Sequence, residues 1–190
     1  WAADEVVERE MEVFNTLYTY HKSFLKEKYQ DLNQPLINFS DLVEVNPSAK
    51  RSDNLDQFGS FVSMSDVTNE GKLIGKEDKP LKELQGNGYT PFCENDILFA
   101  KITPCMENGK GAIAKGLANG VGFGSTEFHV LKPKLDSDLV FCFYLTKMDL
   151  FRQKAEKLMT GSAGQKRVQS DFFDYFKFHA PTKNERKIIG

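Results

Sequence analysis

Residues 88–131 have the sequence GYTPFCENDILFAKITPCMENGKGAIAKGLANGVGFGSTEFHVL, and this stretch decides the fold. After the turn signal END at residues 94–96 comes a short continuous apolar run, ILFA, at residues 97–100. A run of this length beside a turn signal is typical of a strand that is covered on both faces. We therefore expect a buried strand over residues 97–102.

A second strand is predicted at residues 126–131, where Phe128 and Val130 alternate with Glu127 and His129. This alternation gives one buried face and one wet face. Between the two strands lies a long polar excursion that is rich in glycine: Gly109, Gly111, Gly116, Gly120 and Gly122. Two strands thus hold out a loop with many hydrogen-bonding side chains, and such loops usually recognise something.

The rest of the globular part indicates an α+β fold, with a twisted, mostly antiparallel β-sheet and flanking helices. A short strand is expected from Leu36 and another up to Asn46. Helices are expected over residues 139–147 and from Asp149 to the glycine at 161. Residues 71–87 are charged, and we expect them to be irregular and exposed.

Residues 1–32 are expected to form a separate segment, helical by pattern over residues 1–29, ahead of a globular domain over residues 36–186. Apolar residues recur at spacings of four and three from Val7 to Leu25, with no glycine or proline between them. This pattern predicts a long amphipathic helix of the coiled-coil type. We expect it to pack outside the core, against the trailing helix that starts near Glu185 or against a second copy of the chain.

Composition indicates a globular protein without a membrane span. The chain has 190 residues, 40% of them hydrophobic, and a net charge of −2. Residues 147–167 hold six basic and two acidic side chains, net +4, so a partner with negative charge is expected to meet this part. Three cysteines without a CxxC pair favour reduced thiols in a cytoplasmic protein. The chain does not begin with methionine, which suggests a piece of a longer protein.

The common enzyme motifs are missing from the sequence. There is no Walker P-loop, and GVGFG at residues 120–124 does not match the dinucleotide-binding pattern GxGxxG. Neither Ser125 nor Ser162 lies in GxSxG, and the three histidines have no metal-spaced companion. We therefore expect no catalysis, no cofactor and no metal site.

Three blocks of the sequence carry a resemblance: residues 88–114, GFGSTEFHVLKP at 122–133 and MTGSAGQKRV at 159–168. In this order and spacing they resemble the specificity subunits of type I restriction-modification systems, over about residues 36–186. The resemblance implies one target-recognition domain with part of a spacer helix. Its implied partners are double-stranded DNA, the methyltransferase subunits and, through them, the restriction subunit.

Candidate DNA-binding residues lie in and beside the glycine-rich loops. Small polar residues next to glycine let the backbone approach phosphates, lysine and arginine neutralise them, and asparagine and glutamine can grip adenine. The bases Lys110 and Arg167 are expected to lack a structural partner. The candidates are Lys101, Thr103, Asn108, Lys110, Ser125, Thr126, Ser162, Gln165, Lys166 and Arg167. We predict that the loops at residues 101–110 and 161–167 converge on one face.

Two functions of different classes remain open at this point. One is a sequence-specific DNA-recognition module that binds one half of a split target and positions the methyltransferase and nuclease subunits. The other is a protein–protein interaction module in which the helix of residues 1–29 dominates and the loops contact no DNA. Binding to duplex DNA across a salt series separates them, because phosphate contacts make affinity fall steeply with salt.

Overall fold

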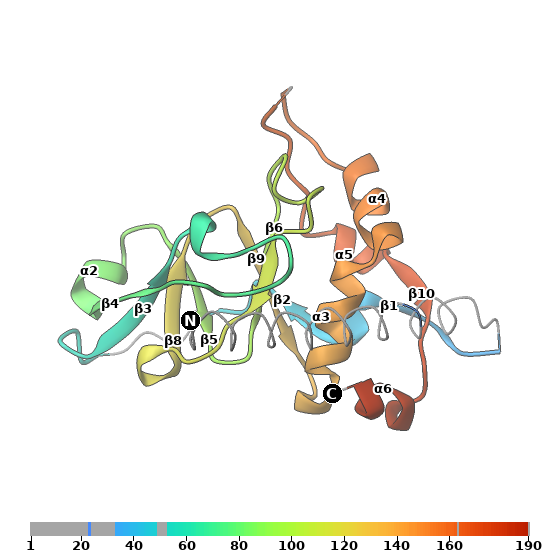
Figure 1. Cartoon of the computed structure of the whole chain (residues 1–190), viewed down its shortest axis with the longest axis horizontal. Coiled ribbons are helices and arrows are strands. Elements are labelled where there is room, and N and C mark those ends of the chain that lie inside the picture. Colours follow the sequence, from blue (N-terminus) through green and yellow to red (C-terminus); the bar gives the residue numbers. More distant parts are fainter. Residues whose placement is uncertain (1–22, 24–32, 49–52, 163, 190) are drawn as a thin grey trace, which may run out of the picture.

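The computed structural model describes residues 23, 33–48, 53–162 and 164–189. The predicted helix of residues 1–32 falls outside these ranges apart from residue 23, so its packing and any self-association through it stay predictions. The described body is α+β, as expected from the sequence, and Figure 1 shows a β-rich part joined to a helical part. No helix in the described ranges is long and apolar enough to cross a membrane.

In the part of the chain that the structure describes, ten strands form three sheets. The central sheet has the order β2-β9-β6-β7 and is antiparallel throughout. The outer sheet has the order β4-β3-β8-β5, and its β3–β8 pair is parallel. A third sheet pairs β1 with β10. The strands are β1 Leu36–Asn38, β2 Val43–Val45, β3 Phe58–Val62, β4 Glu77–Pro80, β5 Thr90–Cys93, β6 Ile97–Ala100, β7 Gly111–Ile113, β8 Val121–Gly124, β9 Phe128–Pro133 and β10 Lys177–His179.

Short helices and turns connect and cover the sheets. The 3-10 helices are η1 Phe39–Asp41, η2 Met64–Asp66, η3 Ala118–Gly120 and η4 Asp136–Asp138. The α-helices are α2 Leu81–Leu84, α3 Leu139–Lys147, α4 Asp149–Lys157, α5 Phe172–Tyr175 and α6 Lys183–Ile189. The starts of α3 and α4 agree with the sequence prediction, whereas α4 ends a turn before Gly161.

The central sheet is buried on both faces, as Figure 1 suggests from its place between the outer sheet and the helices. On β6, Phe99 packs into an aromatic cluster with Phe151 of α4 and Phe173 of α5, while Leu98 faces the outer sheet. The expectation of a strand covered on both faces is therefore confirmed at β6. The wet face expected for the second strand is wrong, because β9 has His129 only 5% exposed.

His129 is tolerated inside the fold because both of its ring nitrogens have hydrogen-bond partners. Its Nε2 lies 2.8 Å from the carbonyl oxygen of Val168, and its Nδ1 lies 3.0 Å from the amide nitrogen of Asn46. Burial lowers the pKa of His129, which favours the neutral ring. The imidazole therefore serves as a hydrogen-bonded core residue beneath the α5 helix.

The glycine-rich excursion between the two predicted strands contains two strands of its own, which the sequence reading missed. In β8, Gly122 and Gly124 lie against the ring of Phe92 in β5. A Cβ atom at Gly122 would lie 2.0 Å from that ring, so only glycine leaves room for it. Residues 71–87, expected to be irregular, likewise include β4 and α2.

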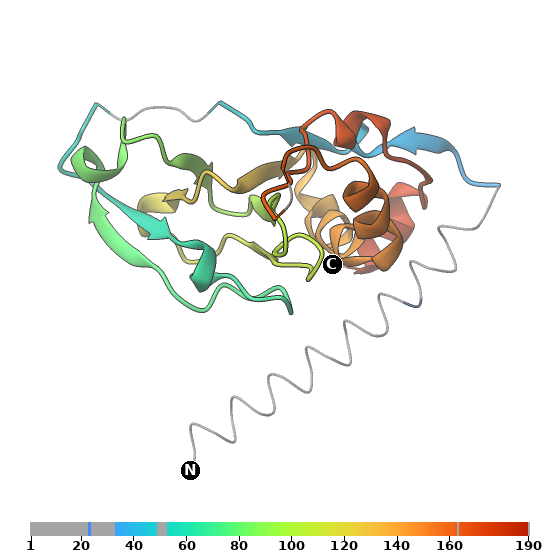
Figure 2. The same cartoon turned by 90° about the horizontal axis from the view of Figure 1, so that it is seen from above.

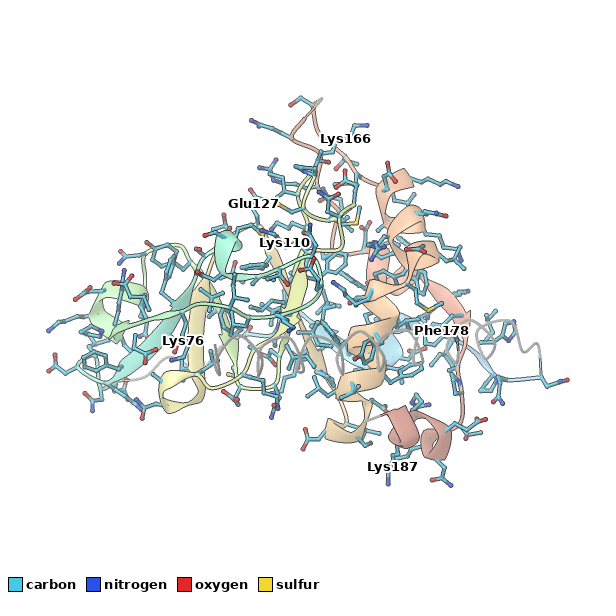
Figure 3. The ribbon with its side chains drawn as sticks, in the orientation of Figure 1. Lys76, Lys110, Glu127, Lys166, Phe178 and Lys187 are labelled. Atoms are coloured by element: carbon cyan, nitrogen blue, oxygen red, sulfur yellow. The ribbon has the colours of Figure 1, made fainter. Side chains whose placement is uncertain are left out.

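The C-terminal part is tied to the body by a buried ion pair. The guanidinium of Arg186 in α6 donates to Asp138 over 2.9 and 3.1 Å, and also to the carbonyl of Pro181 over 2.7 Å. Asp138 is 1% exposed, so both charges are compensated away from water. Figure 3 shows Lys187, at this end of the body, and Lys166 at opposite ends of the molecule.

Candidate nucleic-acid interface

Two loops that are distant in sequence lie side by side. We call residues 101–110 the first loop and residues 161–167 the second loop; Figures 1 and 2 show them next to each other beyond the end of β6. The backbone N–H of Thr103 donates to the carbonyl oxygen of Lys166 over 3.0 Å, and that of Val168 donates to the carbonyl oxygen of Lys101 over 2.9 Å. Ile102 and Arg167 form an isolated β-bridge. The prediction that these loops converge is confirmed.

A third segment, the turn of residues 125–127, joins them. The carbonyl of Glu127 accepts the backbone N–H of Lys101 over 2.9 Å. Its carboxylate faces the second loop, where it binds Arg167. Figure 3 shows Lys110, Glu127 and Lys166 at the same end of the molecule. Loop segments from three parts of the chain therefore form one surface, which we call the loop face.

The first loop is fastened to the body at its far end. The Lys110 ammonium donates to the carbonyl of Met64 over 2.9 Å. The Lys147 ammonium, at the end of α3, donates to the carbonyl of Asn69 over 2.6 Å and to that of Gly109. Only 3% of Lys147 is exposed, and this burial, with Arg152 nearby, lowers its pKa to about 8. These bonds hold the loop at one fixed place.

Inside the first loop, side chains bond one another more than they face outward. The Thr103 hydroxyl donates to Glu107 over 2.7 Å, and Met106 is completely buried. Asn108 is exposed, whereas Lys101 is half-buried. Of the predicted base readers in this loop, Asn108 alone is open to solvent, while the Thr103 hydroxyl is already used.

A cleft of about 550 Å³ separates the first loop from the second loop and the end of α4. It is lined by Thr103, Glu107, Glu156, Lys157, Met159, Gly164 and Lys166. The loop face is therefore hollowed between its two loops.

The described part of the second loop is held at its base, through Thr160 and Arg167, and at Lys166 by the bond from Thr103. Thr160 and Arg167 exchange backbone hydrogen bonds of 3.0 and 2.8 Å, and beyond them the N–H of Gln165 donates to Ser162 over 3.0 Å. Ser162, Gln165 and Lys166 are exposed. Within the described ranges, the Lys166 ammonium makes no hydrogen bond or ion pair. These three predicted residues therefore project into solvent.

Arg167 and Glu127 form a two-pronged ion pair. The Nε and Nη2 atoms of Arg167 donate to the Glu127 carboxylate over 2.9 and 2.8 Å, and Nη1 donates to the carbonyl of Gln165 over 2.9 Å. The bonds from Arg167 lower the pKa of Glu127, so the carboxylate is charged at neutral pH. The expectation that Lys110 and Arg167 lack structural partners is wrong for both residues.

The remaining predicted residues lie in the turn before β9. The Ser125 hydroxyl accepts the backbone N–H of Glu127 over 3.2 Å, which is ordinary turn chemistry. Thr126 is exposed beside it. All ten predicted residues thus belong to the three segments of the loop face, although Thr103, Lys110, Ser125 and Arg167 also have partners within the fold.

The positive charge counted over residues 147–167 is only partly at the surface. Lys147 is buried, and Arg152 donates to the carbonyl of Lys147 over 2.7 Å and to Asp149 over 2.6 Å. The Lys154 ammonium lies 5.1 Å from the centre of the Phe176 ring. The net +4 of this segment therefore overstates the charge that the loop face presents, and the exposed lysines of the segment are Lys154, Lys157 and Lys166.

Sequence reasoning missed Lys147 and Glu127. A signal for Lys147 was available, because α3 has the sequence LVFCFYLTK and a helix that is apolar all round is buried, including its last turn. Glu127 was assigned only to a wet strand face. The described ranges contain no group of three or more His, Cys, Asp or Glu residues that could hold a metal ion.

No known family profile matches the chain. Two curated proteins of Escherichia coli do: the type I restriction enzyme EcoEI specificity subunit, 39% identical over 159 residues, and the EcoAI specificity subunit, 40% identical over 153 residues. The matches cover 81% and 78% of this chain but 26% and 25% of those subunits. The chain therefore spans about a quarter of the length of the curated relatives it matches.

Solved structures give the same answer for the fold. The HsdS subunit from Thermoanaerobacter tengcongensis is similar with a TM-score of 0.62 at 15% identity, over 84% of this chain and 41% of that one. A chain from a study of complex assembly and conformational transition in the type I R-M system also has a TM-score of 0.62, at 17% identity, over 82% of this chain and 40% of that one. The fold is that of these subunits. The resemblance predicted from the sequence is confirmed, and the chain is related to the specificity subunits of type I restriction enzymes.

Proposed function

We propose that the chain is a DNA target-recognition module of a type I restriction-modification system. Residues 36–186 bind one half of a split duplex target through the loop face, and residues 1–32 serve as a spacer helix. The module performs no chemistry itself. It positions methyltransferase subunits and, through them, the restriction subunit.

One observation carries this proposal: three separate segments meet on one face of a chain related to specificity subunits, two of them with small polar and basic residues and the third, residues 125–127, with two hydroxyl residues and a carboxylate. Fixed backbone supports exposed hydrogen-bonding groups there, which is what base readout requires. Asn108, Thr126, Ser162 and Gln165 are the candidates for base edges, because their side chains are exposed. Lys101 and Lys166 are the candidates for phosphates.

A salt series on duplex binding tests the proposal. We expect the affinity of the purified protein for a selected duplex to fall at least tenfold between low and moderate salt. Lys166→Ala should weaken binding to all duplexes about equally and reduce the slope of log affinity against log salt by about 1. The matched control is Lys187→Ala, an exposed lysine at the opposite end of the body.

Discrimination between base pairs is measured in the same binding experiments as affinity. Gln165→Ala should reduce discrimination at one base pair by about 1–3 kcal/mol and leave the salt slope unchanged. A flat salt response of the unaltered protein, or equal binding by Lys166→Ala and the unaltered protein, would reject the loop face as the DNA-binding surface.

A further inference from the structure

We propose that Arg167 reads a guanine in the target, and that Glu127 is the positioning residue that aims it. The inference deepens the proposed function and rests on it. Glu127 is not among the ten residues predicted to bind DNA. The inference gives this acidic residue control over recognition at one base pair.

The first step is an inventory of donors on Arg167. A guanidinium has five N–H donors. Glu127 accepts from Nε and Nη2, and the Gln165 carbonyl accepts from Nη1. Within the described ranges, one donor on each terminal nitrogen is therefore left. The O6 and N7 atoms of guanine accept two donors from one arginine, which is the commonest specific contact in the major groove.

The second step is the rigidity of the pair. Arg167 is bridged through its backbone to Thr160 and Ile102. Glu127 is held by the Ser125 hydroxyl on its N–H and by the N–H of Lys101 on its carbonyl. An arginine whose rotamer is already fixed loses less conformational freedom on binding. The guanidinium is therefore held in place before DNA arrives.

The third step decides between a base and a phosphate. Phosphate neutralisation needs a net positive charge and little orientation. The charge of Arg167 is cancelled locally by a carboxylate that is only 23% exposed, whereas 38% of the arginine side chain remains exposed. A neutral but oriented pair is a poor phosphate anchor and a good directional donor. The contrast with Lys166, which has no such partner in the described ranges, supports this division.

The test uses base analogues in a duplex selected by the unaltered protein. Replacing one guanine at a time with 7-deazaguanine removes the N7 acceptor. We expect one guanine at which the analogue weakens binding by about five- to a hundredfold. For Arg167→Ala the same analogue should have no effect. Arg167→Lys keeps the charge without the fork, so it should lose discrimination there as well.

Glu127→Gln tests the positioning role. It keeps the shape and one acceptor oxygen but removes the charge, so discrimination at that guanine should fall while the salt slope does not become shallower. The control is Glu77→Gln in β4, which removes a carboxylate paired with Lys79 in the outer sheet. It should change neither quantity. Thermal melting of each variant identifies any that fail to fold, and the analogue series on the unaltered protein stands independently of them.

Several results would overturn the inference. If the unaltered protein binds duplexes selectively but Arg167→Ala keeps the sensitivity to every analogue, Arg167 reads no guanine, while the proposed function survives. If Arg167→Ala weakens all duplexes alike and reduces the salt slope, the residue contacts phosphate. If the unaltered protein prefers no duplex, the proposed function fails and the inference fails with it.

Discussion

The first and second loops differ in how they are supported. The first loop is bonded to the body through Lys110 and Lys147 and has Met106 buried beneath it. The second loop is fixed by the Thr160–Arg167 bridge at its base, and its outer side chains face solvent. The difference separates two tasks on one face: the first loop defines where the surface is, and the second presents groups on it.

The largest expected effect comes from removing the support of the first loop. Lys147→Met leaves the carbonyls of Gly109, which is buried, and Asn69, which is exposed, without their donor, and a buried unpaired acceptor costs about 1–3 kcal/mol. Relief of the buried charge offsets part of this. We expect a net loss of about 2–4 kcal/mol in the free energy of unfolding at pH 7, measured by urea denaturation. An unchanged midpoint would show that the loop needs no such fastening.

The pH dependence of the same residue sharpens the point. The pKa of Lys147 is about 8 in the fold against 10.5 for an ordinary lysine. Between these values the unfolded chain holds a proton that the folded chain has lost, so the stability contributed at this site rises with pH. The difference in unfolding free energy between the unaltered protein and Lys147→Met should therefore widen from pH 8 to 10.5, by up to about 3 kcal/mol. A constant difference would mean that Lys147 titrates normally.

Two glycines allow a matched comparison of the loops. Gly109 and Gly164 have similar positive φ angles, +73° and +78°, which L side chains rarely adopt. A Cβ atom at Gly109 would lie 2.6 Å from Nη1 of Arg152, whereas one at Gly164 would have no heavy atom of the described residues within 4 Å apart from its neighbours in the chain. We expect Gly164→Ala to cost about 1 kcal/mol and Gly109→Ala about 2–3 kcal/mol. Equal costs in thermal unfolding would show that the first loop is no more tightly packed than the second.

The smallest effects are expected at Lys110 and Lys166. Lys110→Ala removes a hydrogen bond to Met64 and should cost about 1 kcal/mol of stability. Lys166→Ala should change stability by less than about 0.5 kcal/mol, as is usual for an exposed substitution. Denaturation of both variants beside the unaltered protein provides the measurement. A larger loss for Lys166→Ala than for Lys110→Ala would reverse the assignment of tasks.

The parts that sequence could predict are those where one local pattern settles the structure. The apolar run at β6 predicts burial on both faces, and the ends of α3 follow from its flanking residues. The convergence of the two loops was also predicted, from their shared composition at glycine-marked ends. In each case the residues themselves carry the signal.

The parts that sequence could not predict depend on a partner elsewhere in the chain. Gly122 looks like a loop residue in the sequence, because glycine is depleted in strands. Its place in β8 is explained only by the ring of Phe92, which leaves no room for a Cβ atom there. His129 looks solvent-facing until α5 covers it, with Phe173 at 5.4 Å between ring centres. The ion pair of Glu127 and Arg167 joins residues 40 positions apart, and no spacing rule connects them.

The short sheet of β1 and β10 fixes the distance between the two ends of the described body. Leu36, the first residue of β1, is paired with His179, the last of β10. Paired residues of antiparallel strands lie about 5 Å apart. The path of the chain therefore returns almost to its starting point after building both larger sheets. The body therefore adds mass at one point along the protein, and it adds almost no length between Leu36 and His179.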